Sequence, residues 1–305
     1  MGDARPPRGA YLSASSDVPV VASKRSPWTD LAEVIEELRG SRDLIQQLTL
    51  RDIRIRYKQA IFGFAWALLM PMFVVLSGLA IRLAFSVAAG RGIDKAQVVG
   101  LAIKALAWSF VVGCLNQTTP SLLTNKSLVT KIYFPREVLP LSAVLTQTAD
   151  TAIGALLIFS VFPFLGITPS FQLLWIPLLA LGLWIQSVAA GLFLSCANIF
   201  FRDVKYLVQV FLTFGIFTTP VLLDATMLGE RGMRIIMLNP VSPLLEGLRL
   251  CVVQHHNLLR PLSSATGVQF WTPWYLAYSA LWGIVALLAA TVWFHRSERR
   301  FAELV

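Results

Sequence analysis

Residues 49–88, TLRDIRIRYKQAIFGFAWALLMPMFVVLSGLAIRLAFSVA, decide the fold. A basic segment leads directly into residues 61–81, which contain no charged side chain. At about 1.5 Å per residue, this apolar run is long enough for one helical membrane span. The basic residues that precede it are Arg51, Arg54, Arg56 and Lys58. Cationic residues beside a first span tend to hold that end in the cytoplasm, so we expect a cytoplasmic amino terminus.

Composition places the whole chain in the same class. Of its 305 residues, 56% are hydrophobic and 14% are charged, and the mean hydropathy is +0.65. These values are typical of a multi-pass membrane protein. The net charge of +9 does not indicate nucleic acid, because the basic residues lie mainly at the ends of apolar runs. Cys114, Cys196 and Cys251 lack CxxC spacing, so we expect no disulfide framework and no metal site.

Three regions follow from the pattern. Residues 1–27 are polar and lack the apolar core of a cleavable signal, so we expect a disordered cytoplasmic tail. Residues 28–58 predict two amphipathic helices, which could form a soluble cap or lie in the membrane interface. We favour the interface, because nothing else in the chain could provide a soluble core. Residues 59–305 form the membrane domain.

The apolar runs predict an all-α fold with six transmembrane helices and both termini in the cytoplasm. The expected spans are 61–81, 98–115, two helices of a hairpin within 151–201, 206–223 and 271–294. Lys104 should extend its amine to the lipid headgroups from the second span. Ser187, Gly191 and Ser195 place small side chains on one helix face, which allows another helix to approach closely.

The segment 224–260 is too charged to span in contact with lipid. Pro240 and Pro243 interrupt a continuous helix, because the residue before each proline disfavours the α conformation. We expect two short helices that dip back into the membrane from outside, lining water. Glu246 and Arg249, three residues apart, could pair locally or reach a second copy of the chain.

Catalytic motifs are absent from the sequence. It contains no HExxH or GxSxG motif, and no Gly-Lys-Ser/Thr phosphate loop, so any ATP must be handled by a partner. Asp150 directly precedes the uncharged hairpin segment, and we expect it to be the one acid well inside the membrane. It could tie that helix to a neighbour, relay protons or contact a transported molecule. Phe211 and Phe214 could face lipid, or line a pore and stack on sugar rings.

Several motifs in order resemble the type-2 ATP-binding-cassette permeases that export polysaccharides. These motifs are Arg51-Asp52, Arg56-Tyr57-Lys58-Gln59, Gly63, Trp66, Pro71, residues 131–137 (KIYFPRE), Leu139-Pro140, Phe201-Arg202-Asp203, Asn239-Pro240, Glu246 and Arg249. The resemblance extends from about residue 43 to the carboxyl end. It leaves only about the first forty residues unmatched.

The resemblance implies a homodimer with two copies of a separate ATPase, which supplies the ATP and Mg²⁺. Such a complex exports a lipid-linked glycan, such as O-antigen, capsule or teichoic acid, across the bacterial inner membrane. The ATPase-coupling residues it implies are Lys126, Lys131, Ile132, Tyr133, Phe134, Arg136 and Glu137. The outer gate it implies contains Asn239, Pro240, Glu246 and Arg249.

Alternative functions remain open on the sequence alone. A permease for a drug or small lipid would have the same topology, and a membrane glycolipid enzyme would need more acids than Asp150. The basic junction of Arg51, Arg54, Arg56 and Lys58 has two interpretations as well. It could attract a lipid-diphosphate substrate, with Arg giving bidentate phosphate contacts, or serve only to orient the first span. The sequence does not name the glycan.

Overall fold

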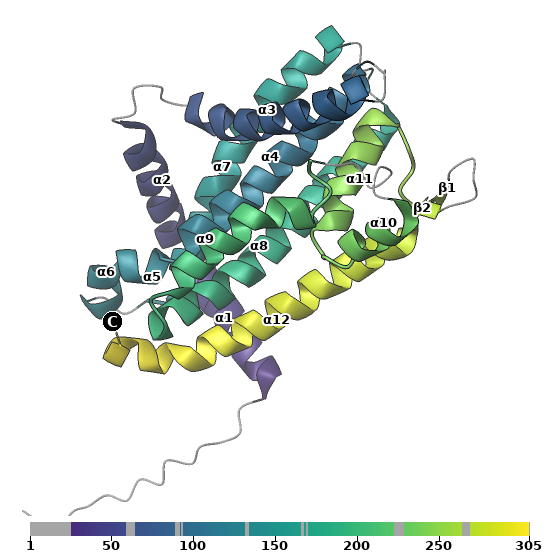
Figure 1. Ribbon diagram of the computed structural model, residues 1–305. Helices are drawn as coiled ribbons and strands as arrows, with labels where there is room; N and C mark the ends of the chain where they lie inside the picture. The colour runs from purple at the N-terminus through teal and green to yellow at the C-terminus, as the bar shows by residue number, and fades with distance from the viewer. Residues whose placement is uncertain are drawn as a thin grey trace, which may run out of the picture.

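The computed structural model is a helical bundle with one small strand pair (Figure 1). It describes residues 26–58, 65–88, 92, 94–131, 134–165, 168, 170–222, 229–263 and 269–304. The expected tail therefore lies almost entirely outside the described residues, as do Ile132 and Tyr133. The all-α class is confirmed. The two strands, β1 (Leu262–Ser263) and β2 (Gln269–Trp271), pair antiparallel and were not expected from the sequence.

Two helices precede the membrane domain. They are α1 (Pro27–Gly40) and α2 (Arg42–Lys58), and Ser26 caps the first by accepting a hydrogen bond from Trp28 N. α1 packs on the last helix and α2 packs on α7, so both rest on the bundle. Ile45 and Leu48 are buried there, whereas Ile55 is 68% exposed. One face of α2 therefore contacts protein while apolar groups on another face stay open.

Four helical stretches are long and apolar enough to cross a membrane: Lys95–Thr118, Val138–Phe164, Phe171–Phe200 and Pro273–Glu298. The helices concerned are α4 (Lys95–Thr118), α7 (Val138–Val161) with η1 (Phe162–Leu165), α8 (Trp175–Phe200) after η2 (Phe171–Leu174), and α12 (Pro273–Leu304). Shorter apolar helices stand at the other two expected positions, within α3 (Ala65–Ala88) and in α9 (Val204–Gly215) with η3 (Ile216–Thr218). α7 begins earlier than expected, which places Asp150 at mid-helix.

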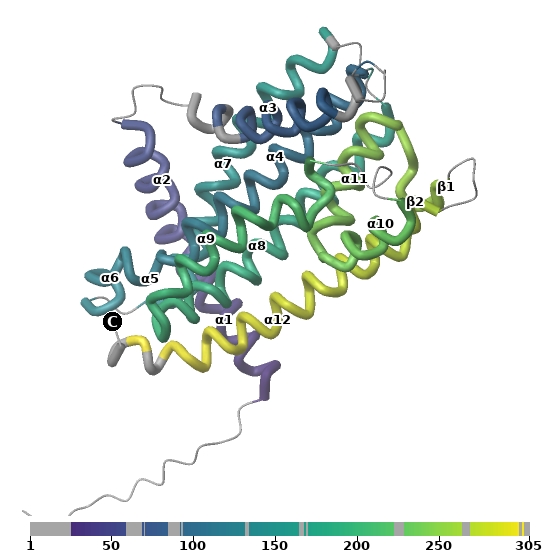
Figure 2. The backbone as a smooth tube through the Cα atoms, viewed as in Figure 1, coloured from purple at the N-terminus to yellow at the C-terminus, as the bar shows by residue number. Residues whose placement is uncertain are grey.

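α4 lies at the centre of the bundle. It packs against α3, α7, α8 and α11, and α3 lies across α4 and α7 (Figure 2). The small-residue face of α8 allows α4 to approach closely, as expected. A Cβ added at Gly191 would lie only 2.9 Å from Thr118 Oγ1 of α4. Ser187 and Ser195 on the same face are buried.

A bent helix pair forms the end of the bundle opposite the carboxyl terminus (Figure 1). α10 (Gly229–Met237) and α11 (Ser242–Val253) meet at 116° across a short break that contains Pro240. This geometry confirms the expected pair of short helices. Two very short helices, α5 (Ser121–Thr124) and α6 (Lys126–Lys131), lie near the carboxyl terminus instead.

Candidate functional site

A cavity of about 700 Å³ lies between α2, α3, α4, α7 and α9. Its walls are apolar with polar side chains distributed among them. The polar lining consists of Arg56, Tyr57, Ser109, Asn116, Gln147, Asp150, Thr151, Gln209 and Thr213. Amides, hydroxyls and one cation in an otherwise apolar space can orient a polar ligand while excluding much of the bulk water.

Asp150 provides the cavity's buried acid. It is 4% exposed, forms an ion pair with Arg56 and accepts a hydrogen bond of 2.6 Å from the Tyr57 hydroxyl. A lone acid at mid-membrane costs about 2.5–3.5 kcal/mol, so two partners from α2 offset a real penalty. We call Arg56, Tyr57 and Asp150 the Asp150 cluster. It joins the basic junction to a transmembrane helix.

Burial shifts the pKa values of Arg56 and Tyr57, the two residues that α2 contributes to this cluster. Burial lowers the pKa of Arg56, and burial raises the pKa of the Tyr57 hydroxyl. Arginine begins from so high a value that it stays cationic at neutral pH. The Tyr57 hydroxyl keeps its proton and therefore donates to Asp150. The Arg56 side chain remains 34% exposed, so its guanidinium can still meet a group that enters the cavity.

Two glutamines form a second polar feature of the wall. Gln117 Nε2 donates to Gln147 Oε1 at 2.6 Å, which ties α4 to α7. Gly113 makes this possible, because a Cβ there would lie 2.4 Å from Gln147 Cδ. The sequence analysis did not select these amides. Only Gln147 carried a signal, because it lies in the uncharged run 138–149 where a polar side chain needs a partner, whereas Gln117 lies in the polar segment NQTT after the second expected span.

The remaining pore candidates lie elsewhere. Leu212 and Ile216 are the apolar residues of α9 and η3 that line the cavity. Phe211 and Phe214 project away from it and are 75% and 63% exposed. The structure therefore brings Asp150 together with Arg56 but separates it from both phenylalanines.

The other basic-junction residues have different surroundings. Arg51 Nη2 donates to Asn125 Oδ1 at 3.0 Å, and its Nε donates to Asp52 Oδ1 at 2.9 Å. Arg51 thus ties α2 to the residue that precedes α6. Arg54 and Lys58 are exposed on α2. Only Arg56 of the four lines the cavity.

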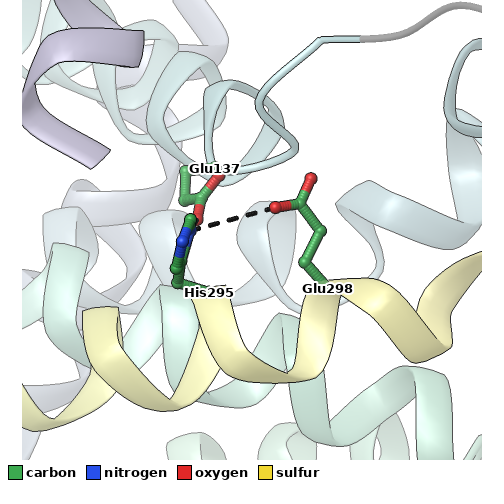
Figure 3. A group of neighbouring side chains, drawn as sticks. All are labelled: Glu137, His295 and Glu298. Atoms are coloured by element: carbon green, nitrogen blue, oxygen red, sulfur yellow. Dashed lines mark ion pairs between the residues drawn. The ribbon is translucent and has the colours of Figure 1, made fainter. Parts of the chain in front are cut away.

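The ATPase-coupling candidates divide into an exposed part and an anchored part. Lys126 and Lys131, at the two ends of α6, are exposed. Phe134, by contrast, is partly buried and packs against the core. Arg136 Nη1 donates to the Glu298 carbonyl at 2.5 Å, and Glu137 is buried beside His295 (Figure 3). The loop between α4 and α7 is therefore fixed to the end of α12.

The gate candidates contain a second buried charge group. Arg249 donates to Glu246 Oε1 from Nε at 2.9 Å and from Nη2 at 2.5 Å, and Lys104 Nζ lies 3.7 Å from Glu246 Oε2. We call Lys104, Glu246 and Arg249 the Glu246 cluster. The expectation for Lys104 was wrong: its side chain has no exposed area and turns toward α11 instead of the headgroups. The Lys104 amine therefore pairs with the Glu246 carboxylate inside the bundle.

Asn239 and Pro240 form the turn of the gate. Asn239 Oδ1 accepts a hydrogen bond from Val241 N, and the Pro240 carbonyl accepts from the Ser279 hydroxyl at 2.6 Å. Glu246 and Arg249 pair locally, one of the two arrangements expected. Both are buried by protein in the single chain, whereas the sequence suggested a water-lined position. Arg249 donates to Glu246 Oε1, while Lys104 faces Oε2 as an ion pair at 3.7 Å, beyond ordinary hydrogen-bond distance.

Comparisons with known proteins agree with one another. The family model described as ABC-2 type transporter matches residues 43–252. An "O-antigen export system permease protein RfbA" of Klebsiella pneumoniae is 24% identical over 265 residues, which is 86% of this chain and 95% of that protein. The protein of the same name from Myxococcus xanthus is 26% identical over 281 residues, covering 90% of this chain and 100% of that protein.

Proposed function

The chain belongs to the ABC-2 type transporter family, and on that premise we propose that it exports a lipid-linked polysaccharide, O-antigen-like, across the bacterial inner membrane. It is a multi-pass membrane permease, and this family lacks a catalytic ATPase domain. Membership in the family implies a nucleotide-binding partner, which would hold the ATP and Mg²⁺. The O-antigen export role named for these relatives supports the substrate in the proposal.

The proposed assembly is a homodimer of this chain with two copies of an ABC ATPase, and both termini in the cytoplasm. The exposed Lys126 and Lys131, with Ile132, Tyr133 and Phe134 after them, would meet the ATPase. Arg136, which is hydrogen-bonded to Glu298, and Glu137, which faces His295, would pass its movement to α12. The α10–α11 pair would form the outer gate.

The observation that carries the substrate proposal is the cavity at the Asp150 cluster. Its amides and hydroxyls suit the hydroxyl groups of sugars, and Arg56 offers a guanidinium of the kind that binds phosphate. The exposed Arg54 and Lys58 on the same helix would attract a lipid diphosphate toward it. The charged and polar groups are thus arranged for a ligand that is anionic at one end and rich in hydroxyls at the other.

The test is ATPase stimulation in proteoliposomes that contain this chain and its ATPase. Lipid-diphosphate-linked glycan, the same lipid diphosphate without sugars, and a small lipophilic drug are added in parallel. We expect the glycan-bearing lipid to stimulate hydrolysis most strongly. Stimulation by the drug alone would replace the proposal with the runner-up, a permease for drugs or small lipids.

A further inference from the structure

Three potential metal ligands converge where the loop between α4 and α7 meets α12 (Figure 3). Glu137 lies at the amino end of α7, while His295 and Glu298 lie one turn apart on α12. One ligand atom from each lies within 4.8 Å of the other two. His295 Nδ1 is 3.5 Å from Glu137 Oε1 and 4.0 Å from Glu298 Oε2.

Glu137 is a buried carboxylate without hydrogen-bond donors in the described part of the chain. The residue is 2% exposed, and neither carboxylate oxygen accepts a hydrogen bond from any residue in the described part of the chain. His295 Nδ1 faces Glu137 Oε1 at 3.5 Å, which suits an ion pair but is longer than an ordinary N–H···O bond. Burying a carboxylate is costly unless a cation or hydrogen-bond donors face it.

Apart from His295, Arg136 is the cation that pairs with these ligands in the described part of the chain. Arg136 approaches Glu298 from its other oxygen, with Nε 3.8 Å from Oε1, so Oε2 remains directed at His295. On the far edge of the imidazole, Glu33 Oε2 lies 3.8 Å from His295 Nε2. That distance is longer than a hydrogen bond, and a small side-chain movement would bring Glu33 to the position of the carboxylate that usually fixes the tautomer and orientation of a metal-binding histidine.

We propose that Glu137, His295 and Glu298 bind a divalent transition-metal ion of the Zn²⁺ type, with Glu33 orienting His295. One imidazole and two carboxylates form a common ligand set for such ions. Two ligands at about 2.1 Å from a tetrahedral ion lie about 3.4 Å apart, so the observed 3.5 and 4.0 Å need only small side-chain movements. The ion would clamp the end of the coupling loop onto α12. The proposal stands independently of the transported substrate.

The test is Zn²⁺ titration of the purified, metal-stripped full chain in detergent, followed by calorimetry and by the thermal unfolding temperature. The chain has three histidines, so His255→Ala/His256→Ala serves as the background that removes the other two. We expect one saturable Zn²⁺ per chain in this background and a higher unfolding temperature when it is bound. Adding His295→Ala or Glu137→Gln should weaken binding at least tenfold.

Glu33→Gln should weaken Zn²⁺ binding about tenfold through the orientation of His295, whereas Glu36→Gln, exposed on the same helix, should not change it. If a ligand variant fails to fold, visible absorption of Co²⁺ added to the background protein reports whether a tetrahedral site with an imidazole exists. Absence of saturable Zn²⁺ binding and of that Co²⁺ spectrum would overturn the proposal. Unchanged affinity in a folded His295→Ala protein would overturn it equally, leaving His295 itself as the partner of Glu137.

Discussion

The Asp150 cluster and the Glu246 cluster both place a charged side chain on a candidate membrane span, but they differ in exposure. In the Glu246 cluster every side chain is sealed, with Lys104, Glu246 and Arg249 at 0%, 2% and 8% exposure. In the Asp150 cluster, the acid is buried but Arg56 is 34% exposed and opens on the cavity. A sealed group can only hold helices together, whereas an open one can exchange its partner for a ligand. We therefore propose that the Glu246 cluster holds α4 to the gate helix α11 and that the Asp150 cluster contacts substrate.

Loss of Glu246 should have the largest effect on stability. Glu246→Gln removes the carboxylate that faces both Lys104 and Arg249, and breaking such a buried pair costs about 3–5 kcal/mol. The free energy of unfolding in detergent, measured by chemical denaturation, should fall by that amount.

A matched control lies on the neighbouring helix. Glu230 and Arg234 form an ion pair on α10 with side chains 47% and 69% exposed. Glu230→Gln should therefore cost less than about 1 kcal/mol. Equal losses in the two variants would mean that burial does not distinguish the pairs, and the comparison would fail.

Asp150→Asn should lower the free energy of unfolding by about 1–2 kcal/mol, which is less than the loss for Glu246→Gln. The reason is that Arg56 can turn toward water when its partner is neutral. Arg56→Gln and the double variant complete a mutant cycle. We expect a coupling energy of about 1 kcal/mol between the two positions. Strict additivity would show that the ion pair contributes nothing to stability.

Gly113→Ala changes the cavity wall and should lower the free energy of unfolding by about 1 kcal/mol. The new Cβ displaces the flexible end of Gln147 and breaks its hydrogen bond with Gln117. Gly40→Ala is the control, since nothing lies within 4 Å of a Cβ at that position. Unfolding measurements should separate the two variants, and an unchanged Gly113→Ala protein would refute the close contact.

Phe211→Ala should change the free energy of unfolding least, by less than about 0.5 kcal/mol, because the ring is 75% exposed. Its exposure fits the proposed homodimer, so self-association in detergent should weaken while unfolding does not change. The check is sedimentation at several concentrations. A large loss of unfolding free energy would instead show that this ring packs within its own chain.

Helix positions could be predicted from the sequence more readily than the side-chain pairs that join distant helices. The uncharged runs and Pro240 were sufficient to predict the long helices and the bent outer pair, because these depend on local composition. The pairs Arg56–Asp150 and Glu137–His295 join positions 94 and 158 residues apart. Helical periodicity gives the face on which a residue lies, but not the element that will cover it. The same limit explains the error for Lys104, whose acid lies on a helix far along the chain.

The most direct measurement of the central claim is the ratio of glycolipid-stimulated to basal ATPase rate in proteoliposomes. It is compared for the original chain, Asp150→Asn and the exposed-pair control Glu230→Gln. If the Asp150 cluster meets the substrate, the ratio falls close to one in Asp150→Asn and keeps its original value in Glu230→Gln. An Asp150→Asn protein that is stimulated as strongly as the original chain would contradict the claim and leave Asp150 with a structural role only.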